Sequence, residues 1–295
     1  MLFHDSGKYQ LKEDTIMAED IKLFVKRLYN HDLLGTAAQL SYYLLLSFFP
    51  FIIALISIVS SISIDKYKLL SEMSLFIPNY IMDIVYQNTE FFTKRASDIG
   101  TISIGFITTI YLSSRGFRAL TRQLNRPYHV AEDRSILVTW TMSIVATLLF
   151  AGFIVVAVSA YILWENYVNL YFSALAASSL YHILRFVLLF MGLTLVISVF
   201  YIAMPNVKLK YHHVLLGASI SSIIWILVST GFEIYITHFS NYANIYGSIT
   251  GIILILLWLY IVSIAILLGN EINGFFYYKK QDTIQIEAIK KAAEK

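Results

Sequence analysis

Long apolar runs are the feature that most constrains the fold of this chain. Four of them, at about 136–163, 181–204, 213–237 and 245–274, each exceed the roughly 20 residues that a helix needs to cross a bilayer. Only 14% of the residues are charged, whereas soluble domains average about 25%. In hydrocarbon, backbone polar groups must bond within the segment, which a helix achieves. The sequence therefore predicts an all-α, polytopic membrane protein.

The N-terminal half adds one clear span and one short one. Residues 33–61 form a long apolar run, and residues 98–114 form a run that is short for a crossing. Lys and Arg decide the second case, because they accumulate in cytoplasmic loops. With six spans and a cytoplasmic N-terminus, 17 of the 22 Lys and Arg residues face the cytoplasm; without a crossing at 98–114, 16 would face outside. The sequence thus favours six spans with both termini cytoplasmic.

Three further segments complete the predicted organisation around a single transmembrane domain, residues 33–278. Residues 1–32 form a cytoplasmic arm, and residues 279–295 form a short, charged, mobile cytoplasmic tail. In the arm, apolar residues at helical spacing with basic residues between them predict an interfacial helix. These apolar residues are Ile21, Phe24, Val25 and Leu28. Residues 62–97 show a similar pattern, broken at Pro78, and predict two helices on the outer membrane surface.

Composition and motifs exclude several classes of function. The chain has no cysteine, which excludes disulfides, thiolate zinc sites and a cysteine nucleophile. Its net charge of +3 is too small to argue for nucleic acid as a partner. No metal-ligand spacing, glycine-rich phosphate loop or nucleophile elbow is present in the sequence. We therefore expect no cofactor, no metal and no enzymatic activity, and we expect membrane lipids with anionic headgroups as partners.

A stripe of arginines interrupts the apolar pattern after residue 114. On a helix with about 100° per residue, Arg115, Arg118 and Arg122 fall within roughly 60° of arc. Two interpretations stay open: the stripe anchors a cytoplasmic loop to lipid phosphates, or its guanidiniums bind an anion at the mouth of a cavity. Asn125 follows, and Pro127 disfavours helix at the residue before it. The helix is therefore predicted to stop there.

Two carboxylates in apolar surroundings each require a partner, because an unpaired charge near hydrocarbon is costly. Glu271 lies at the cytoplasmic end of the last span, on the same side as the arginine stripe. The sequence predicts an ion pair between them, either as a structural lock or as part of a coupling site. On the outer side, Glu233 or Glu165 could pair with Arg185, although snorkelling of Arg185 to the interface explains its position equally well.

The first span carries polar residues that recur at roughly helical spacing. Gln39, Tyr42, Tyr43 and Pro50 combine a polar stripe with a proline that should kink the helix. Transporters use such a combination to line a path near the bilayer midplane. Contacts between helices through small and hydroxyl-bearing residues would give a similar pattern.

Several segments, taken in order, resemble one known family. Residues 37–50 read AAQLSYYLLLSFFP, residues 114–120 read SRGFRAL with Leu124, Asn125 and Tyr128 after them, and residues 246–248, 256–260 and 268–273 read YGS, LLWLY and LGNEIN. These segments resemble signatures of the YihY/virulence factor BrkB family. The resemblance implies a six-span bundle in a bacterial cytoplasmic membrane. It also connects Arg115, Arg118 and Asn125 to a shared signature.

The family once carried a ribonuclease BN label, which this sequence does not support. The first functional hypothesis is a transporter, exporter or flippase for an anionic or amphipathic small molecule or lipid. The alternative is a membrane scaffold that transports nothing and binds anionic lipid or a protein partner at its cytoplasmic face. A membrane-bound ribonuclease is disfavoured.

Overall fold

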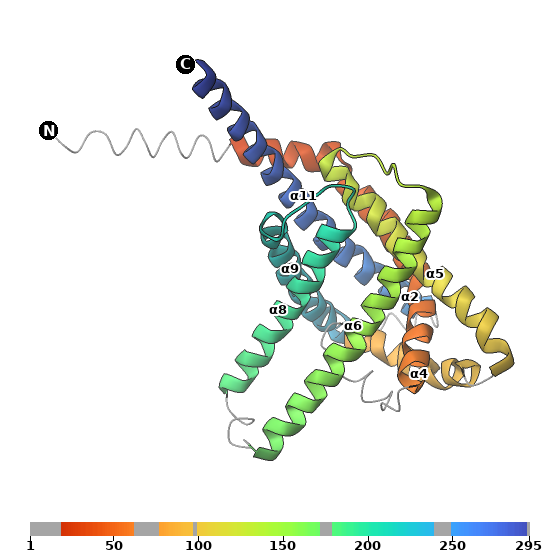
Figure 1. The fold of residues 1–295 in the computed structure, drawn as a ribbon. Helices are drawn as coiled ribbons and strands as arrows, with labels where there is room; N and C mark the ends of the chain where they lie inside the picture. Colours follow the sequence, from red (N-terminus) through yellow and green to blue (C-terminus); the bar gives the residue numbers. More distant parts are fainter. Residues whose placement is uncertain (1–18, 62–76, 97–98, 172–178, 239–248, 294–295) are drawn as a thin grey trace.

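The computed structural model describes residues 19–61, 77–96, 99–171, 179–238 and 249–293, and every regular element in them is helical. A helix at 19–30 precedes the first long one. The others are α2 (Leu33–Ser61), α4 (Asn79–Ala96), α5 (Ile99–Asn125), the 3₁₀ turn η1 (Arg126–Tyr128), α6 (Ile136–Tyr171), α8 (Ser179–Ala203), α9 (Tyr211–His238) and α11 (Ile249–Ala293). This confirms the predicted all-α fold (Figure 1).

Five of these helices contain a segment long and apolar enough to cross a membrane. The segments are Leu33–Ile52, Ile136–Ala157, Phe186–Ala203, Tyr211–Ile236 and Thr250–Lys279. The protein is therefore a multi-pass membrane protein. Helix α5, which contains residues 99–114 of the predicted span 98–114, is not among the five, so the sixth crossing stays a prediction.

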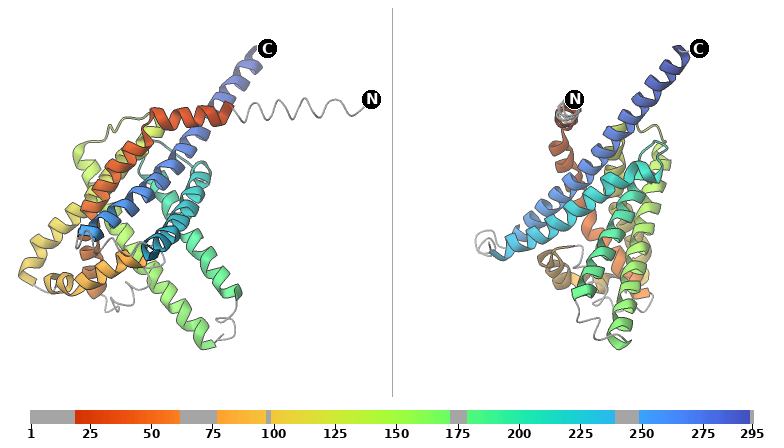
Figure 2. Two further views of the ribbon diagram at one scale, coloured as in Figure 1. Left: turned by 180° about the vertical axis from the view of Figure 1, so that it is seen from behind. Right: turned by 90° about the vertical axis from the view of Figure 1, so that its left-hand side faces the viewer.

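The arrangement of α5 supports that prediction. The C-terminal half of helix α5 packs against α2 and runs in the opposite direction, since Gly116 of α5 faces Ser47 while Gln123 faces Gln39. A helix that returns beside α2 ends where α2 began. Helix 19–30 and the C-terminal part of α11 also lie at that same end (Figures 1 and 2), an arrangement that agrees with an even number of crossings.

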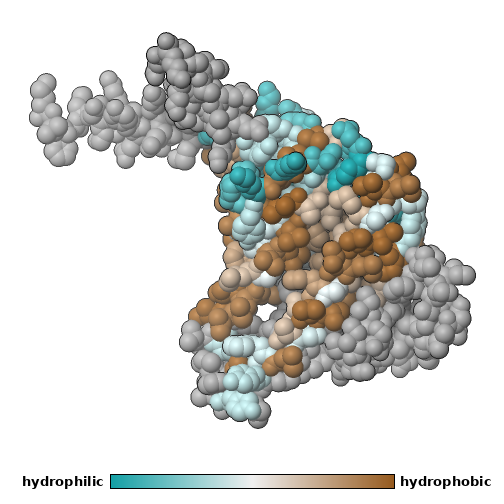
Figure 3. All heavy atoms as spheres, in the orientation of Figure 1, coloured by the Kyte–Doolittle hydropathy of each residue, from teal (hydrophilic) through white to brown (hydrophobic). Residues whose placement is uncertain are grey.

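We call this the basic end of the bundle, because the five arginines between 115 and 134 and both Lys208 and Lys210 lie in the segments that meet there. Figure 3 shows the same division on one face of the molecule: hydrophilic side chains gather at this end, and hydrophobic side chains cover the middle. Such a division is expected of a protein whose middle lies in hydrocarbon.

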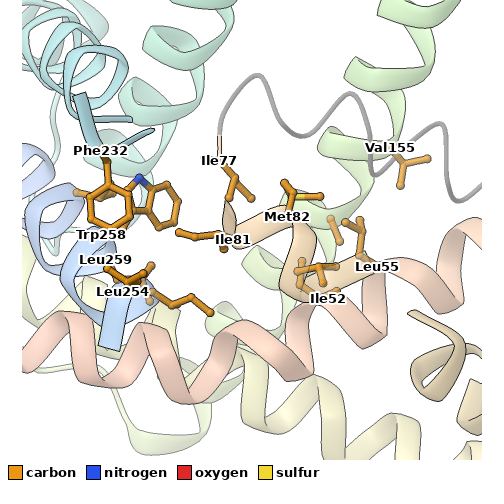
Figure 4. Close-up of a cluster of buried hydrophobic side chains, with 14 residues drawn as sticks. Ile52, Leu55, Ile77, Ile81, Met82, Val155, Phe232, Leu254, Trp258 and Leu259 are labelled. Atoms are coloured by element: carbon orange, nitrogen blue, oxygen red, sulfur yellow. The ribbon is translucent and has the colours of Figure 1, made fainter. Parts of the chain in front are cut away.

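Two apolar clusters hold the helices together. One lies away from the basic end, where Ile52 and Leu55 of α2, Ile81 of α4 and Trp258 of α11 pack together (Figure 4). The other lies toward the basic end, around Leu40, Leu124, Tyr201 and further buried side chains. Association of helices in lipid depends on such close packing, because the surrounding tails are as apolar as the helices themselves.

The helix α4 corrects one prediction. Its apolar side was expected to rest on the outer membrane surface, but Ile81 and Val85 are fully buried in the protein. The neighbouring Ile84 lies against Gly251 of α11. The amphipathic pattern of α4 was interpreted correctly, but its apolar side packs against protein and not against lipid. The other predicted surface helix falls on residues 62–76, outside the described residues.

Helix boundaries agree with most predictions and differ at two ends. Helix α2 spans Leu33–Ser61, as predicted, and continues through Pro50. The α-helical part of α5 ends at Asn125, two residues before Pro127, as the proline predicts. Helix α6 runs about two turns beyond its predicted end, to Tyr171. Helix α11 continues to Ala293, so residues 279–293, predicted as a mobile tail, extend the last helix.

Candidate functional site at the basic end of the bundle

Glu271 is the most strongly constrained charged residue of the basic end. Its side chain is 4% exposed. Its Oε2 accepts a hydrogen bond from Nε of Arg27 at 3.0 Å, and its Oε1 accepts one from Nδ1 of His31 at 2.7 Å. An ionised carboxylate can only accept, so the shared proton lies on Nδ1 of His31. We call these three residues the Glu271 clasp.

The clasp corrects the predicted ion pair. Glu271 does have a cationic partner, as burial of a carboxylate requires, but the partner is Arg27 of helix 19–30 and not an arginine of the stripe. The guanidinium of Arg27 also donates to the carbonyl oxygen of Pro127, and it lies 5.8 Å from the ring centre of Tyr278. The clasp therefore joins helix 19–30, η1 and α11.

The two amides beside Glu271 extend this junction. Nδ2 of Asn270 donates to the carbonyl oxygen of Leu124 at 2.9 Å, which ties α11 to the end of α5. Asn273 bonds α9 twice: its Oδ1 accepts from the backbone N–H of Gly217 at 2.9 Å, and its Nδ2 donates to the carbonyl oxygen of Val214. Three polar residues of α11 thus bind three different elements, because a buried polar group is stable only when it is hydrogen-bonded.

Close helix contacts make these bonds possible. A side chain at Gly269 would collide with the Ser221 hydroxyl and with the backbone of Gly217. Helices α9 and α11 therefore approach each other at two glycines, as small residues permit in membrane proteins. The Ser221 hydroxyl itself donates to the carbonyl oxygen of Ala265 at 2.8 Å, and Tyr201 bonds to the same hydroxyl.

Aromatic and imidazole rings surround the clasp. The rings of His31 and His129 lie 5.3 Å apart, and His129 adopts a left-handed backbone conformation with φ of 51°. Desolvation and the charges of Arg27 and His31 lower the pKa of His129, so its ring is neutral at pH 7. Burial raises the pKa of the Tyr128 hydroxyl well above its usual range, and this neutral hydroxyl donates to Asn270 at 3.4 Å.

Asn125 belongs to a second junction at the same end. Its Nδ2 donates to Oε2 of Glu132 at 2.9 Å, and its Oδ1 accepts from the backbone N–H of Asn206 at 2.6 Å. Arg134 donates to the same carboxylate at 2.5 and 2.6 Å and to the carbonyl oxygen of Met204 at 2.8 Å. The hydrogen bonds from Arg134 and Asn125 hold the pKa of Glu132 below its usual range. Asn125 therefore connects two loops, and its buried amide is already satisfied.

The other predicted residues lie on an exposed surface. We define the α2–α5 face as Gln39, Tyr42 and Tyr43 of α2 together with Arg115, Arg118 and Arg122 of α5. Tyr42 is 55% exposed and Tyr43 36%, and Gln39, Arg115 and Arg122 are exposed as well. Pro50, about two turns further along α2 from this face, is half-buried.

The two helices turn these residues to the same side. Gln39 lies at the edge of the exposed side of α2, and its Oε1 is 3.5 Å from Nε2 of Gln123 across the seam. Gln123 in turn lies on the side of α5 nearest Arg115 and Arg122, by the helical period of about 100° per residue. Between the helices, Leu40, Leu120 and Leu124 are buried. Gln39, Tyr42 and Tyr43 therefore form part of an outer surface and not the lining of an interior between α2 and α5.

Within the α2–α5 face, the arginines differ. Arg118 is half-buried: its Nη1 donates to the Ser114 hydroxyl at 2.7 Å, and its guanidinium lies 5.1 Å from the ring centre of Tyr111 and 5.7 Å from that of Trp140. Arg115 and Arg122 form no ion pair with the residues that the structure describes. These two cations are thus available to an anion from outside the chain.

The outer-side prediction is tested only in part. The Arg185 side chain lies outside the described side chains. Glu233 accepts a hydrogen bond from Nδ2 of Asn79 at 2.5 Å, so a partner for this carboxylate is present on α4. Glu233 also borders a cavity of about 110 Å³ between α8 and α9, which is lined mainly by apolar side chains such as Phe186, Leu193 and Trp225.

Sequence reasoning missed the roles of Arg27 and His31. Arg27 is one of the basic residues between the apolar residues of the predicted interfacial helix, although it lies on the same side of that helix as Phe24 and Leu28 by spacing. That position on the apolar side was the available signal. His31 carried no comparable signal, because its contact with Glu271 joins residues 240 positions apart.

Comparison with known proteins agrees with the architecture. The family model of virulence factor BrkB matches residues 24–294. A putative ribonuclease-like protein YfkH of Bacillus subtilis is 32% identical over 266 residues, covering 88% of this chain and 96% of the relative. A UPF0761 membrane protein of Tolumonas auensis is 30% identical over 261 residues, covering 85% and 83%, and one of Pseudoalteromonas atlantica is 26% identical over 272 residues, covering 89% and 88%.

No solved structure matches the chain. The family model, however, covers nearly the whole transmembrane region, including the Glu271 clasp and the α2–α5 face. The relatives named as membrane proteins agree with the apolar helices found here. This multi-pass membrane protein therefore belongs to the virulence factor BrkB family.

Proposed function

We propose that the protein binds an anionic amphipathic molecule on the α2–α5 face and carries it across the bacterial cytoplasmic membrane. A phospholipid with a negatively charged headgroup is the ligand we select for the test. The observation that carries the proposal is the exposure of Arg115 and Arg122 next to exposed Gln39, Tyr42 and Tyr43, without an acidic partner among the described residues.

The energetics of the membrane favour a ligand at this place. A guanidinium at or near the hydrocarbon boundary is costly unless it is paired or reaches water. Arginine binds phosphate and carboxylate with two parallel hydrogen bonds, which gives geometric specificity as well as attraction. Arg118, held against Tyr111 and Trp140, keeps the adjoining part of the surface ordered.

The same surface also suits an apolar tail. Leu46 of α2 and Leu112 of α5 are 43% and 36% exposed on these two helices, beside the polar residues of the face. A molecule with an anionic head and an apolar body would place the head on the arginines and the body along these leucines. Free inorganic anions would use only the first of these two contacts.

One observation favours the alternative of a scaffold that binds lipid without transport. The seam between α2 and α5 is filled by Leu40, Leu120 and Leu124, so the face lies on the outside of the helix pair. A ligand held there could remain in one leaflet. Movement of the ligand between leaflets therefore separates the two functions.

The ribonuclease-like name of the Bacillus subtilis relative does not enter the proposal. A nuclease needs a metal site or a general base with access to water. In the described part of the chain, no group of three or more His, Asp or Glu side chains is placed to hold a metal ion.

The test compares two double variants of the full-length protein. Arg115→Gln/Arg122→Gln removes the two cations of the face, and Lys208→Gln/Lys210→Gln removes two exposed cations from another loop of the basic end. Native mass spectrometry in the presence of phosphatidylglycerol should show bound lipid on the wild type and the lysine variant, and loss of it on the arginine variant. Equal retention by all three proteins would overturn the binding site.

Transport is then measured in liposomes with a fluorescent phosphatidylglycerol analogue and a quencher that does not cross the membrane. If the protein transports lipid, the quencher should reach more labelled lipid than the outer leaflet initially holds in liposomes with the wild type or the lysine variant. With the arginine variant, only the labelled lipid of the outer leaflet should be quenched. Lipid retained in mass spectrometry without movement between leaflets supports the scaffold and contradicts the transporter.

A further inference from the structure

Helix 19–30 is fastened to the bundle along one side only. Its Phe24 ring packs against Phe275 of α11 with ring centres 5.5 Å apart. One turn further, Arg27 enters the Glu271 clasp, and near the beginning of the helix Asp20 forms an ion pair with Lys279. These contacts determine which side of the helix faces the protein.

With the helix held in this way, an apolar line is turned away from the protein. Ile21 is 63% exposed, Val25 56% and Tyr29 86%. These residues are four apart, so they lie within roughly 80° of arc on a helix. The next sector of the same surface carries Lys22 and Lys26, both exposed. The predicted apolar stripe of this helix is therefore divided, with Phe24 inside and Ile21 and Val25 outside.

The orientation of the helix fits a surface position. Helix 19–30 runs across the start of α2, and α2 descends from it into the bundle (Figures 1 and 2). Because α2 contains a membrane-crossing segment that begins at Leu33, the helix before it lies along the plane in which the bilayer ends. An apolar line beside two cations is the combination by which helices lie on anionic membranes.

We propose that the outward side of helix 19–30 docks on the anionic lipid surface of the membrane, with Ile21, Val25 and Tyr29 inserted and Lys22 and Lys26 among the headgroups. Glu271 helps to position this helix, because its bond to Arg27 is one of the three contacts that set which side faces the lipid. The proposal is independent of transport on the α2–α5 face. Charge decides the occupant: the lysines match lipid phosphates, and the apolar line matches the upper part of the acyl chains.

The absence of cysteine from the chain allows a direct test. Single-cysteine variants at Ile21, Val25, Lys26 and Asn30 are made in the full-length protein, spin-labelled and reconstituted in vesicles of phosphatidylcholine with phosphatidylglycerol. Collision rates are measured with oxygen, which concentrates in lipid, and with a nickel chelate, which stays in water. Labels at 21 and 25 should collide preferentially with oxygen, whereas labels at 26 and 30 should collide preferentially with nickel.

Equal nickel accessibility at all four positions would overturn the proposal. The outward side of the helix would then be a candidate binding surface for a protein partner. Two further variants test the roles of the lysines and of Glu271 separately. Lys22→Gln/Lys26→Gln should remove the dependence of the result at 25 on phosphatidylglycerol while leaving thermal stability unchanged. Glu271→Gln should reduce the contrast between 25 and 26, because weakening one of the three contacts that hold the helix lets it rotate more and average its sides; unchanged contrast in a folded variant contradicts the positioning role of Glu271.

Discussion

The Glu271 clasp and the α2–α5 face both place arginines at the basic end, but their surroundings are opposite. Arg27 is 15% exposed on its side chain and meets a carboxylate that is 4% exposed, whereas Arg115 and Arg122 are exposed and without an acidic partner in the described residues. A buried charge with all its partners in the chain stabilises one arrangement of helices. An exposed charge without such partners is available for binding. The same residue type therefore has two roles, and burial distinguishes them.

Removal of the clasp carboxylate should have the largest effect on stability. In Glu271→Ala, Arg27 stays buried without its counter-ion, and loss of one member of a buried pair typically costs about 3–5 kcal/mol. Thermal unfolding in detergent should therefore begin at a clearly lower temperature than in the wild type. A change no greater than that of a surface substitution would show that the clasp is not a structural lock.

Crowding the clasp should have the next largest effect. A Cβ at Gly274 would lie 2.7 Å from Cβ of Pro127 and 2.9 Å from Nη2 of Arg27, so Gly274→Ala should cost about 1–3 kcal/mol through overpacking. Gly192→Ala is the matched control, because a Cβ there meets no atom within 4 Å. Equal unfolding temperatures for the two variants would contradict the tight fit at the clasp.

The junction of Asn125, Glu132 and Arg134 should show a smaller effect that depends on pH. Glu132→Gln removes a carboxylate that accepts charge-assisted hydrogen bonds, which contribute about 1.5–3 kcal/mol at most. Folding lowers the pKa of the Glu132 carboxyl. The ionised carboxylate therefore stabilises the folded protein at pH values above the pKa that this carboxyl has in the unfolded chain, near 4.5. This stabilisation is lost as the pH falls through the lower pKa of the folded state. Unfolding temperatures of variant and wild type should therefore differ at pH 7 and converge in acid; a constant difference would contradict the shift.

The exposed face should show the smallest change in stability. Arg115→Gln/Arg122→Gln removes no described ion pair, so the unfolding free energy should stay within about 0.5 kcal/mol of the wild type. Measured without added lipid, unfolding temperatures should match those of Lys208→Gln/Lys210→Gln. A large loss would place these arginines with Arg27 as structural residues and would remove the contrast between the two regions.

Much of the fold was predictable because it depends on local chemistry. The span 33–61 matches α2 residue for residue, and Pro127 correctly marked the end of α5. In both cases the deciding residues are neighbours in sequence. The site was harder to predict from the sequence. Glu271 was expected to have a cationic partner, but whether that partner is Arg27 or Arg115 depends on how far helix 19–30 reaches across α11.

By itself, the sequence determined that this chain crosses a membrane as helices and that Glu271 could not stay unpaired. Both conclusions follow from the cost of exposing polar groups to hydrocarbon, which is the same for any arrangement of the helices. Only the tertiary structure decided which side each helix turns outward. Rotating α2 by half a turn would bury Tyr42 and expose Leu40 without changing any apolar run, and it is the packing of Leu40 against its neighbours that selects the observed side.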